Sequence, residues 1–227
     1  MPKKYLFFTK QRCFIIQCIG TFPLLEIYSF NIIYCFFAFV LNKVIIFSAP
    51  SGSGKTTVVN HLLKTNPSLG FSVSATTRKP RANEIDGREY YFLNQEDFEK
   101  KIENKEFLEH EEVYKGIYYG TLKSEVENLW NENKTVVFDV DVVGGMNIKR
   151  EYGKAALSVF LRPPSLAILM ERLRKRSTEV EHQLEMRINK AKEELKYEDK
   201  YDIVLVNDKL EVTLLKAEEI VTNFINE

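Results

Sequence analysis

Cysteine and histidine are scarce in this chain, and each scarcity excludes a kind of chemistry. The three cysteines all precede Lys43, so the rest of the chain has no disulfide and no cysteine that could act as a nucleophile. A reducing cell interior suits such a chain. The three histidines have no clustered ligand partners, which argues against a transition-metal site; they are His61, His110 and His182.

The chain also has no net charge at neutral pH. The 227 residues include 32 Lys and Arg against 32 Asp and Glu. Because general nucleic-acid binding depends on a basic surface, this balance argues against a nucleic-acid partner. The length fits one α/β domain with insertions. The charges are unevenly spread, since Glu26 is the only charged residue from Cys13 to Asn42.

The N-terminal segment, residues 1–42, differs in composition from the rest. A basic start is followed by an apolar, aromatic-rich stretch, a pattern that resembles a signal or a membrane anchor. The uncharged run Ile27–Asn42 is shorter than the roughly 20 residues that a spanning helix needs. A longer segment would include Glu26, Pro23 and Gly20, which weaken a membrane helix.

Three interpretations of residues 1–42 remain open: a targeting or anchor segment, a packed or loosely ordered extension, and a stretch absent from the working protein. We expect a cytoplasmic protein. The alternative is an organelle-targeted or membrane-anchored protein, associated with the membrane only through residues 13–42. Because the catalytic signals begin at Lys43, we assign the functional domain to residues 43–227.

The stretch Val44–Thr57 reads VIIFSAPSGSGKTT. Val44–Phe47 is a β-branched and aromatic run, typical of a strand buried on both faces. The small residues that follow allow consecutive backbone N–H groups to surround phosphate oxygens, and a helix over Thr56–Lys64 adds its positive N-terminal end. We expect Lys55 at the β- and γ-phosphates of ATP and Thr56 on Mg²⁺. The expected ATP-binding residues of this loop are Pro50, Ser51, Gly52, Ser53, Gly54, Lys55, Thr56 and Thr57.

Ala49 departs from the phosphate-loop pattern G-x-x-x-x-G-K-[ST], which places glycine there. If the backbone at this position has a positive φ, alanine costs about 1 kcal/mol, whereas with a negative φ the cost is small. An incidental Gly/Ser turn is the alternative interpretation of the loop. It does not explain why Lys55 and Thr56 follow Gly54 directly.

A second basic segment follows a short strand expected over Phe71–Ser74. Arg78 and Arg81 flank Pro80, which stiffens the backbone between them. Two guanidinium groups at a fixed separation suit a phosphate dianion, and the Tyr90 hydroxyl can add a third donor. Taken alone, the segment could equally be a basic surface loop that closes a hairpin.

Together the two motifs resemble those of the guanylate kinase family. The loop at Ala49–Thr57 and the segment from Thr76-Thr77-Arg78 to Tyr90–Leu93 stand at the family's spacing, although the family usually begins the loop with glycine. The resemblance runs from about Lys43 to the C-terminus. It implies a small, partly β GMP-binding insertion at 76–134 and an arginine-rich lid at about 172–190, with the core at 43–75 and 135–227.

The alternation of strands and helices points to the same fold class. It predicts an α/β fold of the P-loop NTPase type, with an open, mostly parallel sheet and helices on both faces. Later in the chain we expect a helix after Gly144-Gly145, a core strand over Leu157–Leu161, a surface helix over Lys190–Lys200, a last strand over Ile203–Val206 and a terminal helix over Leu210–Ile225. In the terminal helix, the expected core contacts are Leu214, Leu215, Ile220 and Phe224.

The resemblance also implies how a guanine nucleotide is held. Glu109 takes the N1–H and 2-amino donors of guanine, with Asp141 near the 2-amino group. Adenine would present an unprotonated N1 to the Glu109 carboxylate, acceptor against acceptor, so GMP is expected over AMP. Without the resemblance, Glu109 would be interpreted as a solvated acid in a Glu-rich stretch. The implied GMP-binding residues are Ser74, Arg78, Arg81, Tyr90, Glu109, Tyr119, Thr121 and Asp141.

Asp139 follows a buried strand expected over Thr135–Phe138. An acid at the carboxyl end of a parallel strand beside the phosphate loop can hold Mg²⁺ through water, so we assign Asp139 to the metal. Asn207 follows the last strand, where the family contacts the adenine of ATP.

The arginines of the lid, Arg172, Arg176 and Arg187, are implied to close over the transferring phosphoryl group and to neutralise its charge. Arg172 and Arg176 share one helical face, and Arg174 lies off it. Taken alone, such a run would be interpreted as a solvated helix face.

The sequence therefore predicts a guanylate kinase that transfers the γ-phosphoryl of Mg·ATP to GMP, with dGMP as a further acceptor, in purine nucleotide metabolism. We expect a monomer or weak dimer. A guanylate-kinase-like binding module is one alternative, although such modules tend to lose the phosphate-loop and lid residues kept here. A kinase for another nucleoside monophosphate is the second, and Glu109, Ser74 and Thr121 argue against it. The expected catalytic residues are Lys55, Arg78, Arg172, Arg176 and Arg187.

Overall fold

The computed structural model describes residues 4–8, 13–17, 42–81, 84–176 and 181–227. The chain forms two compact units, Met1–Val40 and Leu41–Glu227. In the first unit, β1 (Lys4–Phe8) and β2 (Cys13–Gln17) pair antiparallel. Most of the run Ile27–Asn42 lies outside the described residues, so the three interpretations of the segment remain predictions. Every helix that the structure describes falls short of the length and apolarity needed to cross a bilayer.

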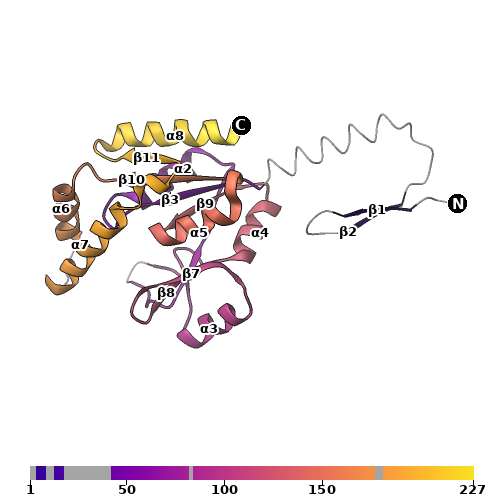
Figure 1. Cartoon of the computed structure of the whole chain (residues 1–227), viewed down its shortest axis with the longest axis horizontal. Helices are drawn as coiled ribbons and strands as arrows, with labels where there is room; N and C mark the ends of the chain where they lie inside the picture. The colour runs from indigo at the N-terminus through magenta and orange to yellow at the C-terminus, as the bar shows by residue number, and fades with distance from the viewer. Residues whose placement is uncertain (1–3, 9–12, 18–41, 82–83, 177–180) are drawn as a thin grey trace. The chain divides into compact units, whose positions relative to one another are not determined.

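A five-stranded parallel sheet forms the centre of the second unit, in the order β11-β10-β3-β9-β4 (Figure 1). The strands are β3 (Val44–Ser48), β4 (Leu69–Phe71), β9 (Thr135–Val140), β10 (Ala156–Arg162) and β11 (Ile203–Val206). β3 is central and all of its residues are buried. This confirms the strand expected over Val44–Phe47 and the predicted α/β fold class.

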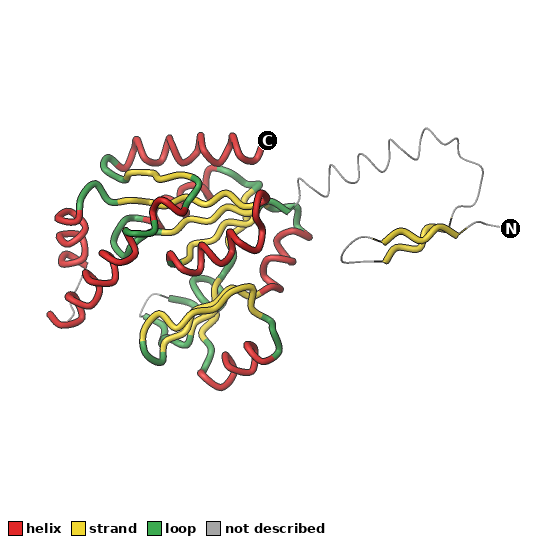
Figure 2. Tube along the Cα trace, viewed as in Figure 1, coloured by secondary structure: helices red, strands yellow, loops and turns green. Residues whose placement is uncertain are grey.

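Helices cover both faces of this sheet (Figure 2). Because side chains alternate along β3, Ile45 and Phe47 pack in one core cluster with α2 (Lys55–Thr65) and α8 (Leu210–Asn226). Val44 and Ile46 pack in a second cluster with α4 (Lys123–Asn131) and α5 (Val142–Tyr152). A short helix, η1 (Gly153–Ala155), leads from α5 into β10.

A smaller mixed sheet forms the predicted insertion, in the order β6-β5-β8-β7. Its strands are β5 (Ser74–Thr76), β6 (Tyr91–Phe92), β7 (Phe107–Tyr114) and β8 (Ile117–Leu122), and α3 (Gln95–Glu103) packs on it through Phe98. The single strand expected over Phe71–Ser74 is wrong. The chain leaves the main sheet after Phe71, where β4 pairs with β9, and joins the second sheet at Ser74.

Two further expectations are wrong, and one is confirmed with a shift of its end. Gly144 and Gly145 lie inside α5 rather than before it; a Cβ at Gly145 would collide with Ser48 Oγ and the Tyr201 hydroxyl, so glycine allows α5 to approach these side chains closely. The strand expected over Thr135–Phe138 is present as β9 and continues to Val140, so Asp139 lies within it. Leu215 is 67% exposed and makes no core contact, whereas Leu214, Ile220 and Phe224 pack against the core.

The lid region contains α6 (Leu166–Arg176) and α7 (Glu181–Leu195), joined by residues outside the described part of the chain. Leu169 and Leu173 of α6 pack against Ile188 and Ala191 of α7. The surface helix expected over Lys190–Lys200 is therefore wrong. The helix starts earlier, is buried on one side and ends at Leu195, and a separate turn η2 (Glu198–Lys200) follows.

Candidate active site

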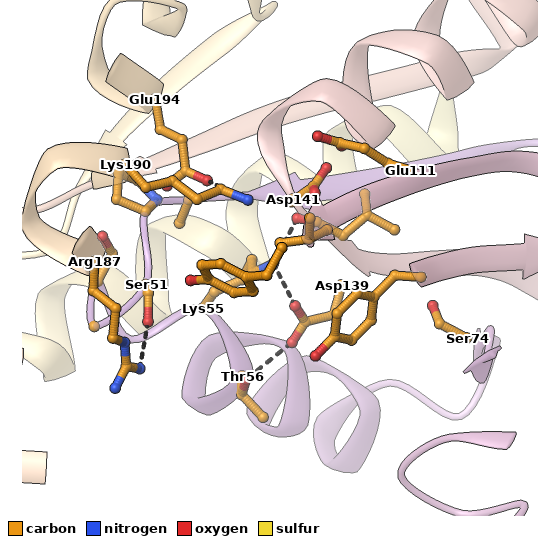
Figure 3. Close-up of a pocket in the computed structure, with 18 of the residues that line it drawn as sticks. Ser51, Lys55, Thr56, Ser74, Glu111, Asp139, Asp141, Arg187, Lys190 and Glu194 are labelled. Carbon is orange, nitrogen blue, oxygen red and sulfur yellow. Dashed lines mark hydrogen bonds and ion pairs between the residues drawn. The ribbon is translucent and has the colours of Figure 1, made fainter. Parts of the chain in front are cut away.

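A pocket of about 330 Å³ lies at the carboxyl ends of β3 and β9 and is also lined by β7, β8 and α7 (Figure 3). It brings together residues that lie more than 100 positions apart in the sequence. The predicted site residues that line it are Pro50, Ser51, Gly52, Ser53, Gly54, Lys55, Thr56, Thr57, Ser74, Arg81, Tyr90, Glu109, Tyr119, Asp139, Asp141 and Arg187. Four predicted residues with described side chains lie outside this lining, namely Arg78, Thr121, Arg172 and Asn207. The side chain of Arg176 lies outside the described part of the chain.

The phosphate loop depends on two glycines in the left-handed region, Gly52 (φ +90°) and Gly54 (φ +93°). Gly54 is the N-cap of α2, so the open helix terminus faces the pocket. A Cβ at Gly54 would lie 2.5 Å from Nδ2 of Asn207, which donates to the carbonyl of Ser53 at 2.7 Å. The buried Asn207 side chain therefore holds the loop in this structure, a contact that the sequence did not suggest.

Ala49 causes no backbone strain. Lys105 and Asn133 are the only non-glycine residues with positive φ in the described part of the chain, so φ at Ala49 is not positive. Ala49 is 5% exposed and packs in the core cluster of Ile45 and Phe47. The condition under which alanine would cost about 1 kcal/mol is not met.

Lys55, Thr56 and Asp139 form one connected group (Figure 3). Lys55 Nζ lies 2.6 Å from Asp139 Oδ1 and donates to the carbonyl of Val140 at 2.5 Å. The Thr56 hydroxyl donates to Asp139 Oδ2 at 3.0 Å. A hydroxyl and a carboxylate are the hard oxygen ligands that Mg²⁺ prefers. These two oxygens suit an ion that takes its other ligands from water and phosphate. The described residues contain no group of three or more His, Cys, Asp or Glu side chains placed to hold a metal ion.

A second group of acidic residues lines the same pocket. The Thr121 hydroxyl donates to Glu109 Oε1 at 2.8 Å, and Ser74 lies opposite Thr121 in the β5–β8 pairing. Burial raises the pKa of Glu109 to about 7. Asp141 caps α5 by accepting the N–H of Gly144 at 2.8 Å. A Cβ at Gly144 would lie 2.9 Å from Glu109 Oε2, so glycine allows the helix to approach this carboxylate closely.

Arg78 is held next to the pocket by a forked ion pair. Its two terminal nitrogens donate to the Glu84 carboxylate at 2.8 and 2.9 Å, and its Nε donates to the Tyr119 hydroxyl at 3.2 Å. The guanidinium lies 5.3 Å from the ring centre of Tyr90. Arg78 therefore orders two of the predicted phosphate ligands, Tyr90 and Tyr119, while Arg81 reaches the pocket itself.

The lid arginines differ in position. Arg187 of α7 lines the pocket and donates to the Ser51 hydroxyl of the phosphate loop at 2.9 Å. Arg172 of α6 donates instead to the backbone carbonyl of Asn207 at 3.3 Å. The structure thus brings Arg187 together with the phosphate loop and places Arg172 against the end of β11.

Sequence reasoning missed four charged residues. Glu84 orders Arg78, and Glu111, Lys190 and Glu194 line the pocket. A signal for Glu111 was available, because β-strand alternation puts it on the same face as Glu109. The i, i+4 spacing of Lys190 and Glu194 predicts that both side chains lie on one face of a helix. It does not predict that this face lines the pocket, because the orientation of α7 is set by its packing against α6.

Comparisons with known proteins agree with this geometry. Residues 41–224 match the family model described as guanylate kinase. The guanylate kinase of Bacteroides thetaiotaomicron is 52% identical over 184 residues, which cover 81% of this chain and 90% of the relative. The guanylate kinase of Porphyromonas gingivalis is 48% identical over 186 residues, covering 82% of this chain and 99% of the relative. A crystal structure of guanylate kinase from Anaplasma phagocytophilum shares 30% identity and a TM-score of 0.65, covering 80% of this chain and 85% of that one.

Proposed function

The chain belongs to the guanylate kinase family and is an ATP:GMP phosphotransferase, and we propose how its residues divide the reaction. The reaction requires two anionic substrates held in line, with the γ-phosphoryl group between them. Catalysis is then mainly positioning and charge stabilisation. The observation that carries the proposal is that the phosphate loop and the partly buried Glu109 carboxylate line the same pocket.

At the ATP end, the backbone N–H groups from Ser51 to Thr56 bind phosphate oxygens at the N-terminus of α2. Lys55, which forms an ion pair with Asp139 in the structure, neutralises negative charge on the β- and γ-phosphates when ATP is bound. The Thr56 hydroxyl and, through water, the Asp139 carboxylate would hold Mg²⁺, which would supply positive charge to stabilise the charge that develops on the phosphates. Asn207 keeps the loop in shape and contacts the adenine of ATP.

At the GMP end, Glu109 accepts the N1–H of guanine and Asp141 accepts from the 2-amino group, with Ser74 and Thr121 near O6. The hydroxyl of Thr121 already donates to Glu109, which fixes the orientation of that carboxylate. Arg78, Arg81, Tyr90 and Tyr119 bind the phosphate of GMP. Arg78 also holds the Tyr119 hydroxyl by a hydrogen bond and lies against the Tyr90 ring. A base with an acceptor at N1 would leave the second oxygen of this carboxylate, which Thr121 does not reach, facing an acceptor instead of a donor, and this disfavours AMP.

Arg187 stabilises the transferring phosphoryl group, since it already contacts Ser51 of the phosphate loop. We assign Arg172 and Arg176 to the same task, with α6 and α7 as a lid over about 172–190 that closes on bound substrates. We further propose residues 76–134 as the GMP-binding insertion and residues 43–75 and 135–227 as the core. The enzyme is proposed to act in the cytoplasm as a monomer or weak dimer, with dGMP as a second acceptor.

The test is ADP release from Mg·ATP with GMP, dGMP, AMP, CMP or UMP as acceptor. Turnover restricted to the guanine nucleotides is the expected result. Turnover with AMP at a comparable rate would refute the role of Glu109. A folded protein that binds GMP but turns over none of the acceptors would indicate a binding module instead. Omission of Mg²⁺, with EDTA present, should abolish turnover if the metal assignment is correct.

A further inference from the structure

Glu111 lines the pocket, and the roles assigned above leave it unused. Side chains alternate along β7, so Glu109 and Glu111 lie on the face of the strand that lines the pocket together with Val113. The Oε2 atom of Glu111 is buried and has no hydrogen-bond partner among the residues that the structure describes. Burial of an acceptor without a donor is unfavourable, so a ligand that supplies the donor would be stabilised here.

Three carboxyl groups converge at this end of the pocket. A Cβ at Gly144 would lie 2.9 Å from Glu109 Oε2 and 3.1 Å from Asp141 Oδ1, so these two acids meet at one glycine. Glu111 lies next to Asp141 (Figure 3). Burial, and then the neighbouring Asp141 carboxyl, raise the pKa of Glu111 to about 8. Such a concentration of acceptors is favourable only if donors are bound among them.

Two of the oxygens already have donors. Glu109 Oε1 accepts from the Thr121 hydroxyl, and Asp141 Oδ1 accepts from the N–H of Gly144. The Glu111 carboxyl lies within hydrogen-bonding reach of the Asp141 carboxyl, and its buried Oε2 has no donor among the described residues. The donor edge of guanine carries three N–H groups, one on N1 and two on the 2-amino group. Glu111 therefore adds a third carboxyl acceptor beside the two, Glu109 and Asp141, that are already assigned to this edge.

We propose that Glu111 is a specificity-determining residue, whose Oε2 accepts one N–H of the 2-amino group of guanine. The inference rests on the proposed guanine site around Glu109 and extends it by one residue. It also predicts which base the enzyme rejects. Hypoxanthine keeps N1–H and O6 but lacks the 2-amino group, so IMP leaves the Glu111 acceptor unsatisfied.

Lys190 of α7 also faces this cluster, and an ion pair with Glu111 would be a different use of the same carboxylate. The ammonium group of Lys190 has other partners in the structure, however. It lies 3.8 Å from Glu194 Oε1 and 5.2 Å from the ring centre of Tyr114. Lys190 acts on Glu111 as a nearby positive charge, and among the described residues it donates no hydrogen bond to Glu111 Oε2. The donor for this oxygen is therefore assigned to the nucleotide.

The test compares kcat/KM for GMP, dGMP and IMP, with Mg·ATP, in the full-length wild type and in Glu111→Ala and Glu111→Gln. Glu111→Ala should lower kcat/KM for GMP about tenfold, mainly through KM, because one hydrogen bond to the base is lost. Its kcat/KM for IMP should stay within about twofold, so the GMP/IMP preference falls about tenfold. Glu111→Gln keeps an acceptor oxygen and should retain most of the preference. Glu112→Ala, an exposed neighbour on the same strand, should leave the preference unchanged.

Equal losses for GMP and IMP in Glu111→Ala would overturn the inference and point to a structural or lid contact. A selective loss of the GMP/dGMP preference would also overturn it, because the donor would then be the ribose 2′-hydroxyl. A GMP/IMP preference unchanged in an active Glu111→Ala enzyme would reject this inference alone. Failure of the wild type to phosphorylate GMP would reject the proposed function and the inference together.

Discussion

Among single residues, Lys55 offers the clearest separation of chemistry from folding. It begins α2 and pairs with Asp139, while the Thr56 hydroxyl binds the other oxygen of the same carboxylate. Lys55→Met should therefore fold, because Asp139 keeps one donor. Turnover should fall by a factor of about 100 or more, since the charge on the transferring phosphate loses its fixed cation. Steady-state rates with Mg·ATP and GMP, together with circular dichroism, check both parts.

Lys64→Met is the matched control for this variant. Lys64 lies at the other end of α2 and is exposed, so its replacement changes the net charge equally without touching the pocket. Its turnover should equal that of the wild type. Near-normal turnover in folded Lys55→Met would remove Lys55 from the catalytic set.

Glu109 links pH to both stability and substrate affinity. Burial raises its pKa from 4.5 to about 7, so the folded protein holds this proton more tightly than the unfolded chain. The contribution of Glu109 to the free energy of unfolding therefore decreases as pH rises from about 4.5 to 7. The ionised carboxylate is the form that accepts N1–H, so kcat/KM for GMP should rise over that window and level off above it.

The pH profiles of kcat/KM for Glu109→Gln and Glu194→Gln distinguish the group responsible. Burial also raises the pKa of Glu194, to about 7, and this residue lines the same pocket from α7. We expect the rise to disappear in Glu109→Gln and to persist in Glu194→Gln. The reverse pattern would transfer the pH dependence to the lid helix.

The predictable part of the site is the part encoded in local patterns. The Gly/Ser-rich loop and Lys55 could be located because the loop, the cation and the helix N-terminus are consecutive in the sequence. The distant residues Glu109 and Asp141 were placed in one site by family resemblance and not by spacing. The roles of Glu84 and Asn207 as supports could not be found, because each depends on a contact between chain segments that only the fold brings together.

At the level of elements, the same distinction separates correct predictions from wrong ones. The strand β11 was found to the residue, because an apolar run bounded by polar residues is a local signal even at a sheet edge, where only Leu205 of the four residues is buried. The sequence prediction joined β4 and β5 into one strand because the residues of both have strand-like composition. They are separate strands because β4 pairs with β9 in the main sheet and β5 pairs with β8 in the smaller sheet. Gly144 and Gly145 suggested a loop, but close approach to neighbouring side chains requires glycine inside α5.

Lys43 joins the start of β3 to the end of α8. Its Nζ donates to the carbonyls of Phe224 at 2.7 Å and Ile225 at 3.3 Å, in the last turn of the helix, where carbonyls lack intrahelical donors. Lys43 is 7% exposed, so the contact is shielded from water. Lys43→Met should lower the free energy of unfolding by about 1–3 kcal/mol and leave kcat unchanged.

Urea unfolding of Lys43→Met beside Lys216→Met measures this effect. Lys216 is exposed in the middle of α8, so its replacement should leave the unfolding midpoint within error of the wild type. Equal midpoints for the two variants would show that the α8 terminus does not depend on Lys43.

For the whole molecule, the second compact unit contains every residue that lines the pocket and also Lys43 with both of its helix-end partners. A protein comprising residues 41–227 should therefore fold and match the full-length chain in kcat and in KM for both substrates. A protein comprising residues 44–227 differs only by losing Leu41, Asn42 and Lys43, and it should be less stable by about the amount lost in Lys43→Met. Parallel kinetics and urea unfolding of the three proteins test this division. A lower kcat in the 41–227 protein, at equal stability, would show that the N-terminal segment takes part in catalysis.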